Sequence, residues 1–147
     1  MHRIFKAVVA TGDTFIYDPD MPTNEVKDLW LSPGYAPYVA LKNHKVLGMC
    51  VVRPILKGRA SHIANASFMV DPVAQGQGIG TRLGELAISE AKRLGYIAMQ
   101  FNIVVSTNLH AVGLWRKLGF NILASVPQGF SHKEKGLVDS YIMYRSL

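Results

Sequence analysis

The sequence has no long apolar run and contains a single cysteine. Its 147 residues are 49% hydrophobic, yet no stretch approaches the roughly 20 apolar residues of a membrane-spanning helix. Cys50 cannot form an internal disulfide, and its apolar neighbours predict a buried strand in which it is a small core residue. The first residues also lack the apolar segment of a secretory signal peptide. These absences favour a cytoplasmic protein.

Acidic residues are few. Ten Asp and Glu against 16 Lys and Arg give a formal net charge of +6, which favours an anionic ligand. The basic residues are scattered, and there is no zinc-finger spacing or RNA-binding aromatic signature, so a polyphosphate cofactor is favoured over nucleic acid. No paired carboxylates or metal-ligand cluster are present, and we expect no metal.

The length predicts one domain over residues 1–147. Helices are predicted at 24–31, with Thr23 as the N-cap, and at 79–94 and 109–118, because apolar residues recur there at helical spacing. Residues 127–137 read as a loop. Strands are predicted at 3–10, 38–42, 46–53, 62–70, 96–105, 121–126 and 138–145. The order predicts an α/β (α+β) fold, a mixed sheet of about seven strands with helices on both faces.

A glycine-rich loop lies between the fourth predicted strand and a helix. Residues 69–85, MVDPVAQGQGIGTRLGE, place Gly76, Gly78 and Gly80 two apart. Such a loop leaves backbone N–H groups unpaired at the positive end of a helix, where phosphate binds. The dinucleotide and ATP-binding patterns both fail on spacing, because Thr81 stands where each needs a glycine when counted from Gly76.

Residues 75–80, QGQGIG, resemble instead the Q/R-x-x-G-x-G/A signature of the GNAT superfamily of acyl-CoA-dependent N-acyltransferases. The segment NLHAVGLWRKLGF at 108–120 resembles the second signature of that family, a helix that begins at Asn and closes on Gly-Phe. The order of elements agrees with the family over nearly the whole chain. The resemblance implies an acetyl-CoA-dependent N-acetyltransferase that acts by direct transfer in a ternary complex, with a small-molecule amine, such as an amino acid or a proline-like secondary amine, as its second substrate.

The resemblance also implies how coenzyme A binds. The strand before the glycine loop splays from its neighbour and accepts the pantetheine arm. A backbone N–H at the splay, near Met69 or Val70, is expected to hold the thioester carbonyl. The loop amides hold the pyrophosphate, and the Asn at the start of the second helix serves as its N-cap, as a pantetheine contact or as both. The implied cofactor-binding residues are Met69, Val70, Gln75, Gly76, Gln77, Gly78, Ile79, Gly80, Thr81, Arg82 and Asn108.

Amide side chains occur on two predicted neighbouring strands, where amides are depleted. By alternation Asn65 and Ser67 share one face of their strand, and Gln100 and Asn102 share a face of theirs. The resulting polar strip either is satisfied by loops and caps or recognises a polar acceptor or its carboxylate.

Three segments, ANASFMV, QFNIVVSTN and LWRKLGF, look most like a GNAT branch that includes fungal acetyltransferases of proline analogues such as azetidine-2-carboxylate. The matching asparagines imply that Asn65 lies in the acceptor pocket and that Asn102 and Asn108 lie near the thioester or cofactor. Two flanking loops offer side chains that either line this pocket or pack in the core: Thr14, Phe15 and Tyr17 from the first, and Phe130 and His132 from the second.

One position departs from the family. Many members carry a Tyr on the second helix that protonates the leaving thiolate, but here the residue is Trp115, whose indole cannot serve as that acid. Tyr141, Tyr144 or water is the substitute donor, and His62 is a candidate base acting through water. The candidate catalytic residues are Asn65, His62, Tyr141 and Asn102.

Two other functions remain open on the sequence. Trp115 is compatible with a catalytically silent acyl-CoA-binding module. A protein or peptide N-acetyltransferase is the other alternative, although the net positive charge disfavours basic, histone-like acceptors. The family resemblance also implies that a homodimer can form.

Overall fold

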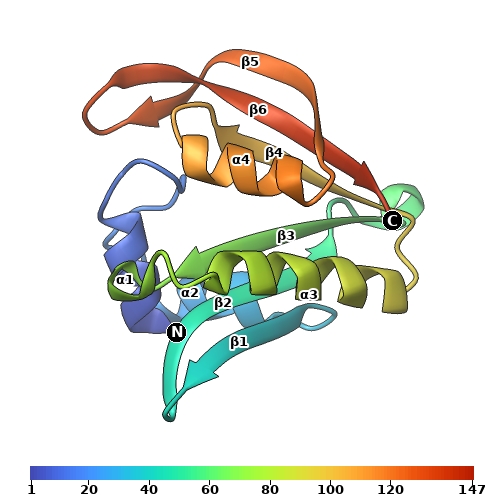
Figure 1. Cartoon of the computed structure of the whole chain (residues 1–147), viewed down its shortest axis with the longest axis horizontal. Helices are drawn as coiled ribbons and strands as arrows, with labels where there is room; N and C mark the ends of the chain where they lie inside the picture. The colour runs from blue at the N-terminus through green and yellow to red at the C-terminus, as the bar shows by residue number, and fades with distance from the viewer.

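The computed structural model describes residues 1–147, which form one six-stranded mixed sheet with four α-helices around it (Figure 1). The helices are α1 (His2–Val9), α2 (Thr23–Leu31), α3 (Ile79–Arg93) and α4 (Leu109–Lys117). The strands are β1 (Ala36–Lys42), β2 (Lys45–Pro54), β3 (Ile63–Val70), β4 (Ala98–Val105), β5 (Asn121–His132) and β6 (Gly136–Ser146), with short 3-10 turns η1 (Gly58–Ala60) and η2 (Pro72–Ala74).

The sheet order is β1-β2-β3-β4-β6-β5, and only β3 and β4 run parallel. The two-residue turn between β1 and β2 has φ of +49° at Asn43 and +60° at His44, the left-handed geometry of a tight hairpin. Gly95 and Gly119 follow α3 and α4 at φ of +85° and +83° and end those helices. The central elements from β1 to α4 therefore lie where the sequence predicts them, within about two residues.

Helices pack on both faces of the sheet. Alternation along β2 sends Met49 and Val51 to the core under α1 and α2, and Cys50 and Val52 to the core under α3 and α4. In Figure 1 α3 and α4 lie in front of the sheet. The predicted mixed α/β sheet with helices on both faces is confirmed.

The first predicted strand, residues 3–10, is wrong, because residues 3–9 lie in α1 and Ala10 is its C-cap. Its apolar residues Ile4, Phe5 and Val9 are buried against the sheet, while Arg3 and Lys6 are exposed, which is the periodicity of one helix face. The β-branched composition favoured a strand, but burial of this stripe stabilises a helix. The sheet accordingly has six strands and not about seven.

Two element ends also differ from the predictions. Pro22, and not Thr23, occupies the N-cap of α2, because the Pro22 carbonyl already accepts the N–H of Val26 at 3.0 Å, and the helix has no side-chain cap. Residues 127–132 belong to β5, so the predicted loop shrinks to the turn between His132 and Gly136. A bulge after Val126 absorbs the irregular residues there.

Candidate active site

The sheet opens between β3 and β4. These strands pair only at Ile63 with Ala98 and at Ala64 with Met99. Beyond that point β3 continues to pair with β2, and β4 with β6, while the facing edges of β3 and β4 form no ladder. Figure 1 shows the two strands diverging toward their C-terminal ends. The expected splayed strand is therefore present.

Asn65 lies at the point of separation. Its Nδ2 donates a hydrogen bond of 2.8 Å to the Gln100 carbonyl oxygen, which replaces the ladder bond that the strands no longer form. The polar strip (Asn65, Ser67, Gln100 and Asn102) lies on the face that carries α1 and α2, because the alternating residues Ala64, Ala66, Met99 and Phe101 belong to the core under α3 and α4. Gln100 Nε2 donates to Asn102 Oδ1 at 2.8 Å. The strip predicted from the sequence is assembled across the opening.

The glycine loop begins beside the same opening. Gly76 and Gly78 have φ of +75° and +73°, and Gly78 is the N-cap of α3. The N–H groups from Gly76 to Thr81 form no hydrogen bond within the protein, and the first helical bond runs from Arg82 N–H to the Gly78 carbonyl at 3.1 Å. Unpaired N–H groups at the start of a 15-residue helix attract an anion.

A buried aspartate anchors the turn before this loop. The Asp71 side chain accepts the N–H of Val73 and forms an ion pair with Arg3 of α1. The hydrogen bond from Arg3 is the main cause that lowers the pKa of Asp71 below its ordinary value, against the opposing effect of burial. Sequence reasoning missed this pair, because its members are 68 residues apart and nothing in the sequence signals their contact.

Successive N–H groups at the end of β3 point in opposite directions. Asp71 N–H donates to the Leu47 carbonyl of the neighbouring segment at 2.8 Å. Because N–H direction alternates along a strand, Met69 N–H points to β2, while Val70 N–H points to the opening. Of the two groups expected to hold a thioester carbonyl, Val70 has the orientation for it.

Asn108 is the N-cap of α4. Its Oδ1 accepts the N–H of Ala111 at 3.0 Å, whereas its Nδ2 forms no hydrogen bond within the protein. The cap role predicted for Asn108 is confirmed, and its amide hydrogens stay free for a ligand.

Trp115 is part of the core. Its ring centre lies 4.7 Å from that of Phe68 on β3 and 4.8 Å from that of Phe101 on β4, and only 8% of the residue is exposed. These aromatic side chains fill the face of the opening that lies under α3 and α4. Trp115 therefore packs across the splayed strands and has no acid–base role.

The other predicted catalytic residues lie in different places. His62 is exposed and precedes β3 at the end where β3 and β4 are paired. Tyr141 lies opposite Val104 and packs against the core under α3 and α4, while Tyr144 lies opposite Gln100 and so shares the face of the polar strip. The structure brings the tyrosines to the opening from β6 but leaves His62 at a distance along the strand.

The two loops expected to flank an acceptor are tied together. Lys133 N–H, in the turn between β5 and β6, donates to the Gly12 carbonyl at 2.9 Å. Phe15 and Tyr17 stack at 5.9 Å and pack against the core under α1 and α2. Phe130 is buried in β5.

Two polar side chains of these loops have different surroundings. The Oγ1 of Thr14 is buried without a hydrogen-bond partner. His132 Nδ1 accepts the N–H groups of Glu134 and Lys135 at 3.1 and 3.3 Å, so this side chain shapes the hairpin turn.

Sequence reasoning missed Arg53. It lies on β2 directly opposite Asn65, and its Nη2 donates to Ser67 Oγ at 3.0 Å. Its Cζ lies 5.5 Å from the ring centre of Tyr35. The available signal was a lone Arg at the end of an otherwise apolar strand.

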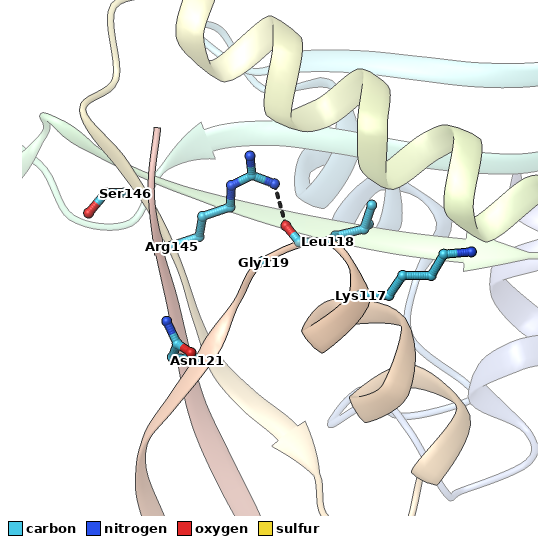
Figure 2. A pocket seen from close by; sticks show the side chains of 6 residues that line it. All are labelled: Lys117, Leu118, Gly119, Asn121, Arg145 and Ser146. Atoms are coloured by element: carbon cyan, nitrogen blue, oxygen red, sulfur yellow. Dashed lines mark hydrogen bonds between the residues drawn. The ribbon is translucent and has the colours of Figure 1, made fainter.

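A cavity of about 560 Å³ lies away from the opening. It is lined by Lys117, Leu118, Gly119, Asn121, Arg145 and Ser146. Figure 2 shows Arg145 donating to the Leu118 carbonyl at the end of α4, where a cation neutralises the helix terminus. Arg145 pairs with Met99, so this cavity lies at the closed end of β3 and β4 and not at the opening.

A second cavity of about 510 Å³ lies beside the turn that precedes the glycine loop and is lined by Arg3, Lys45 and Asp71 among others. No His, Cys, Asp or Glu side chains cluster in groups of three or more that could hold a metal. None of the helices combines the length and apolar character needed to span a bilayer.

Comparisons with known proteins agree with this geometry. Residues 7–120 match the acetyltransferase (GNAT) family. N-acetyltransferase aca1 of Schizosaccharomyces pombe is 30% identical over 153 residues, which span 91% of this chain and 72% of that protein. A GCN5-related N-acetyltransferase from Kribbella flavida has a TM-score of 0.96 at 38% identity and covers 100% of this chain and 90% of its own.

The structure of yncA from Salmonella typhimurium, which contains its cofactor acetyl-CoA, has a TM-score of 0.85 at 25% identity over 99% of this chain and 86% of its own. A family match over most of the sequence thus accompanies two structural features, the sheet that opens between β3 and β4 and the glycine loop with its unpaired N–H groups. The chain belongs to the GNAT family of N-acetyltransferases, which use acetyl-CoA as the acetyl donor.

Proposed function

We propose that residues 1–147 form one N-acetyltransferase domain that moves the acetyl group of acetyl-CoA to the amine of a small molecule, such as an amino acid or a proline-like secondary amine, by direct attack in a ternary complex. The observation that carries this proposal is the polar strip on one face of the opening, next to the glycine loop. Donor and acceptor can therefore meet between β3 and β4 from two sides.

The donor occupies the loop and the opening. The free N–H groups from Gly76 to Thr81 hold the pyrophosphate, and the exposed Arg82 adds positive charge. The pantetheine arm runs between the splayed strands, where Asn108 Nδ2 meets it. Val70 N–H polarises the thioester carbonyl.

The acceptor approaches from the face of α1 and α2. Asn65 contacts it, and Asn102 lies near the thioester. The loops that carry Phe15 and Tyr17, together with β5 at Phe130, close the sides of this pocket.

Direct attack fits the side chains present. The amine nitrogen forms a bond to the carbonyl carbon, the carbon–sulfur bond breaks, the amine loses a proton and the thiolate gains one. The only cysteine cannot supply an acyl-enzyme, because burial raises the pKa of the Cys50 thiol to about 12 and removes it from solvent.

Two groups handle the protons. Tyr141 protonates the thiolate, since it lies on the face of the donor and opposite the open part of β4. The amine releases its proton to water. Tyr141→Phe lowers kcat with little change in either Michaelis constant, and Tyr144→Phe is the matched control.

The test measures thiol release from acetyl-CoA over a panel of small amines, amino acids and a basic peptide, with mass spectrometry of the products. Acetylation of a small amine that is at least tenfold more efficient in kcat/KM than acetylation of the peptide supports the proposal. Preference for the peptide supports the protein acetyltransferase alternative. Calorimetry with acetyl-CoA is the companion measurement.

A catalytically silent acyl-CoA-binding module is the second candidate. Trp115 stands where many family members carry the tyrosine that protonates the thiolate, and here it packs in the core. Tight binding of acetyl-CoA without turnover on any amine would favour it. A cytoplasmic location and a homodimer complete the proposal. Cell fractionation and sedimentation at several protein concentrations test these two points.

A further inference from the structure

A half-buried arginine lies at the edge of the polar strip. Arg53 faces the same side of the sheet as Asn65, its direct partner on β3. The hydrogen bond to Ser67 holds its guanidinium over β3, the strand that borders the opening, and the Tyr35 ring packs against it. Contacts from two sides therefore fix the orientation of this cation.

Arg53 has no carboxylate partner in the protein. The ion pairs present are Arg3 with Asp71 and Arg93 with Glu90. A guanidinium carries five N–H donors, and Ser67 takes the only side-chain hydrogen bond that Arg53 forms. Because Ser67 uses one of these donors, the others are available to an anion from outside the chain.

The anion is not the phosphate of coenzyme A. The glycine loop follows the C-terminal end of β3, whereas Arg53 lies opposite Asn65 near the beginning of that strand. The strip itself consists of uncharged amide and hydroxyl side chains. An anion bound at Arg53 therefore lies on the acceptor face, beside the point where β3 and β4 separate.

We propose that Arg53 is the residue that recognises an amino acid acceptor: its guanidinium binds the carboxylate of the acceptor while the amine points into the opening. This inference rests on the function proposed above and adds the residue that selects the acid. A planar guanidinium presents two parallel donors that match the two oxygens of a carboxylate, and Ser67 and Tyr35 hold that plane in place.

The test compares each amino acid with its primary amide, for example L-proline with L-prolinamide, in the wild type and in Arg53→Met. Each comparison uses the ratio of variant to wild-type kcat/KM, so the different amine pKa values of acid and amide cancel. Removal of one charge-assisted contact lowers kcat/KM for the acid between about 10-fold and 100-fold, mainly through KM. For the amide the ratio stays within about threefold.

Matched controls separate recognition from damage. Arg59→Met removes the same charge from the exposed turn η1 and leaves kcat/KM unchanged for both the acid and the amide. Arg53→Lys restores part of the preference for the acid. The affinity of Arg53→Met for coenzyme A, measured by calorimetry, equals that of the wild type when the fold is intact.

Equal losses on acid and amide, or no loss on the acid, would overturn the role of Arg53 while leaving the acetyltransferase function standing. Failure of the wild type to acetylate any small amine would overturn the proposed function itself, and the inference with it. A wild type that prefers the amide would contradict only the substrate class.

Discussion

Replacing Gly78 with aspartate or asparagine tests which ligand the glycine loop holds. Gly78 is exposed, has φ of +73° and lies at the N-cap of α3, and a Cβ built there meets no heavy atom within 4 Å. Asp and Asn have nearly the same size, and both tolerate the left-handed region better than other residues. The pair therefore differs by one negative charge placed beside the free N–H groups.

The size of the effect follows from Coulomb's law. A carboxylate about 5 Å from a phosphate charge costs roughly 3 kcal/mol at an effective dielectric constant near 20. Water screens such an exposed site, so about 1 to 2 kcal/mol remains, which corresponds to a loss in affinity of about 10-fold. Both side chains carry an oxygen that can accept the free N–H groups of the first turn, so this competition is common to the two variants. Backbone strain of about 1 kcal/mol is common to both variants and cancels.

The assay is calorimetric titration of both variants with coenzyme A and with S-acetylpantetheine, which lacks the phosphates. Gly78→Asp binds coenzyme A about 10-fold more weakly than Gly78→Asn, and the gap narrows at high salt. The two variants bind S-acetylpantetheine equally. Equal affinities for coenzyme A, or an equal gap for the phosphate-free ligand, would show that the pyrophosphate lies elsewhere.

Three further changes probe other parts of the site. Asn65→Ala raises the Michaelis constant of the acceptor more than that of acetyl-CoA, and steady-state kinetics showing the reverse order would remove Asn65 from the acceptor pocket. The lowered pKa of Asp71 stabilises the fold fully above the ordinary pKa of the group, and this stability is lost as pH falls through the folded value. In urea unfolding, the free energy of unfolding of Arg3→Met therefore falls less between pH 7 and pH 3 than that of the wild type. Parallel pH profiles of the two proteins would contradict this. Cys50→Ala keeps its kcat within about threefold, whereas loss of turnover in a folded variant would indicate an acyl-enzyme.

Local signals were sufficient to predict the middle of the fold. The turn at Asn43, Pro72 after β3 and Gly95 after α3 each mark the end of a periodic segment, so the elements between them could be placed from the sequence. Gly12, at φ of +66°, also marks an end after residues 2–9, but an end signal does not distinguish a helix from a strand. The β-branched composition favoured a strand, whereas Ile4 and Phe5 are buried against the sheet from one face of a helix. Burial decides that case, and burial is a property of the assembled fold.

The donor half of the site was predictable for the same reason, since a glycine loop and a helix start are contiguous in sequence. The acceptor half depends on register. Asn65 and Asn102 could be selected from the sequence because amides are unusual in strands. Arg53 could be placed beside the site only once the strand register put it opposite Asn65. The ion pair between Arg3 and Asp71 likewise joins segments that no local pattern connects.

The opening between β3 and β4 also explains why Asn65 matters for more than contact with an acceptor. Strand edges with unpaired N–H and C=O groups are costly unless something satisfies them. The bond from Asn65 to the Gln100 carbonyl satisfies the first of these groups and marks where pairing stops. Beyond it the free edges suit an extended arm with its own amide groups, which the pantetheine of acetyl-CoA supplies. We therefore expect bound coenzyme A to slow hydrogen exchange at Phe68 and Val70, whose N–H groups point into the opening, and to leave Met69, directed at β2, unchanged.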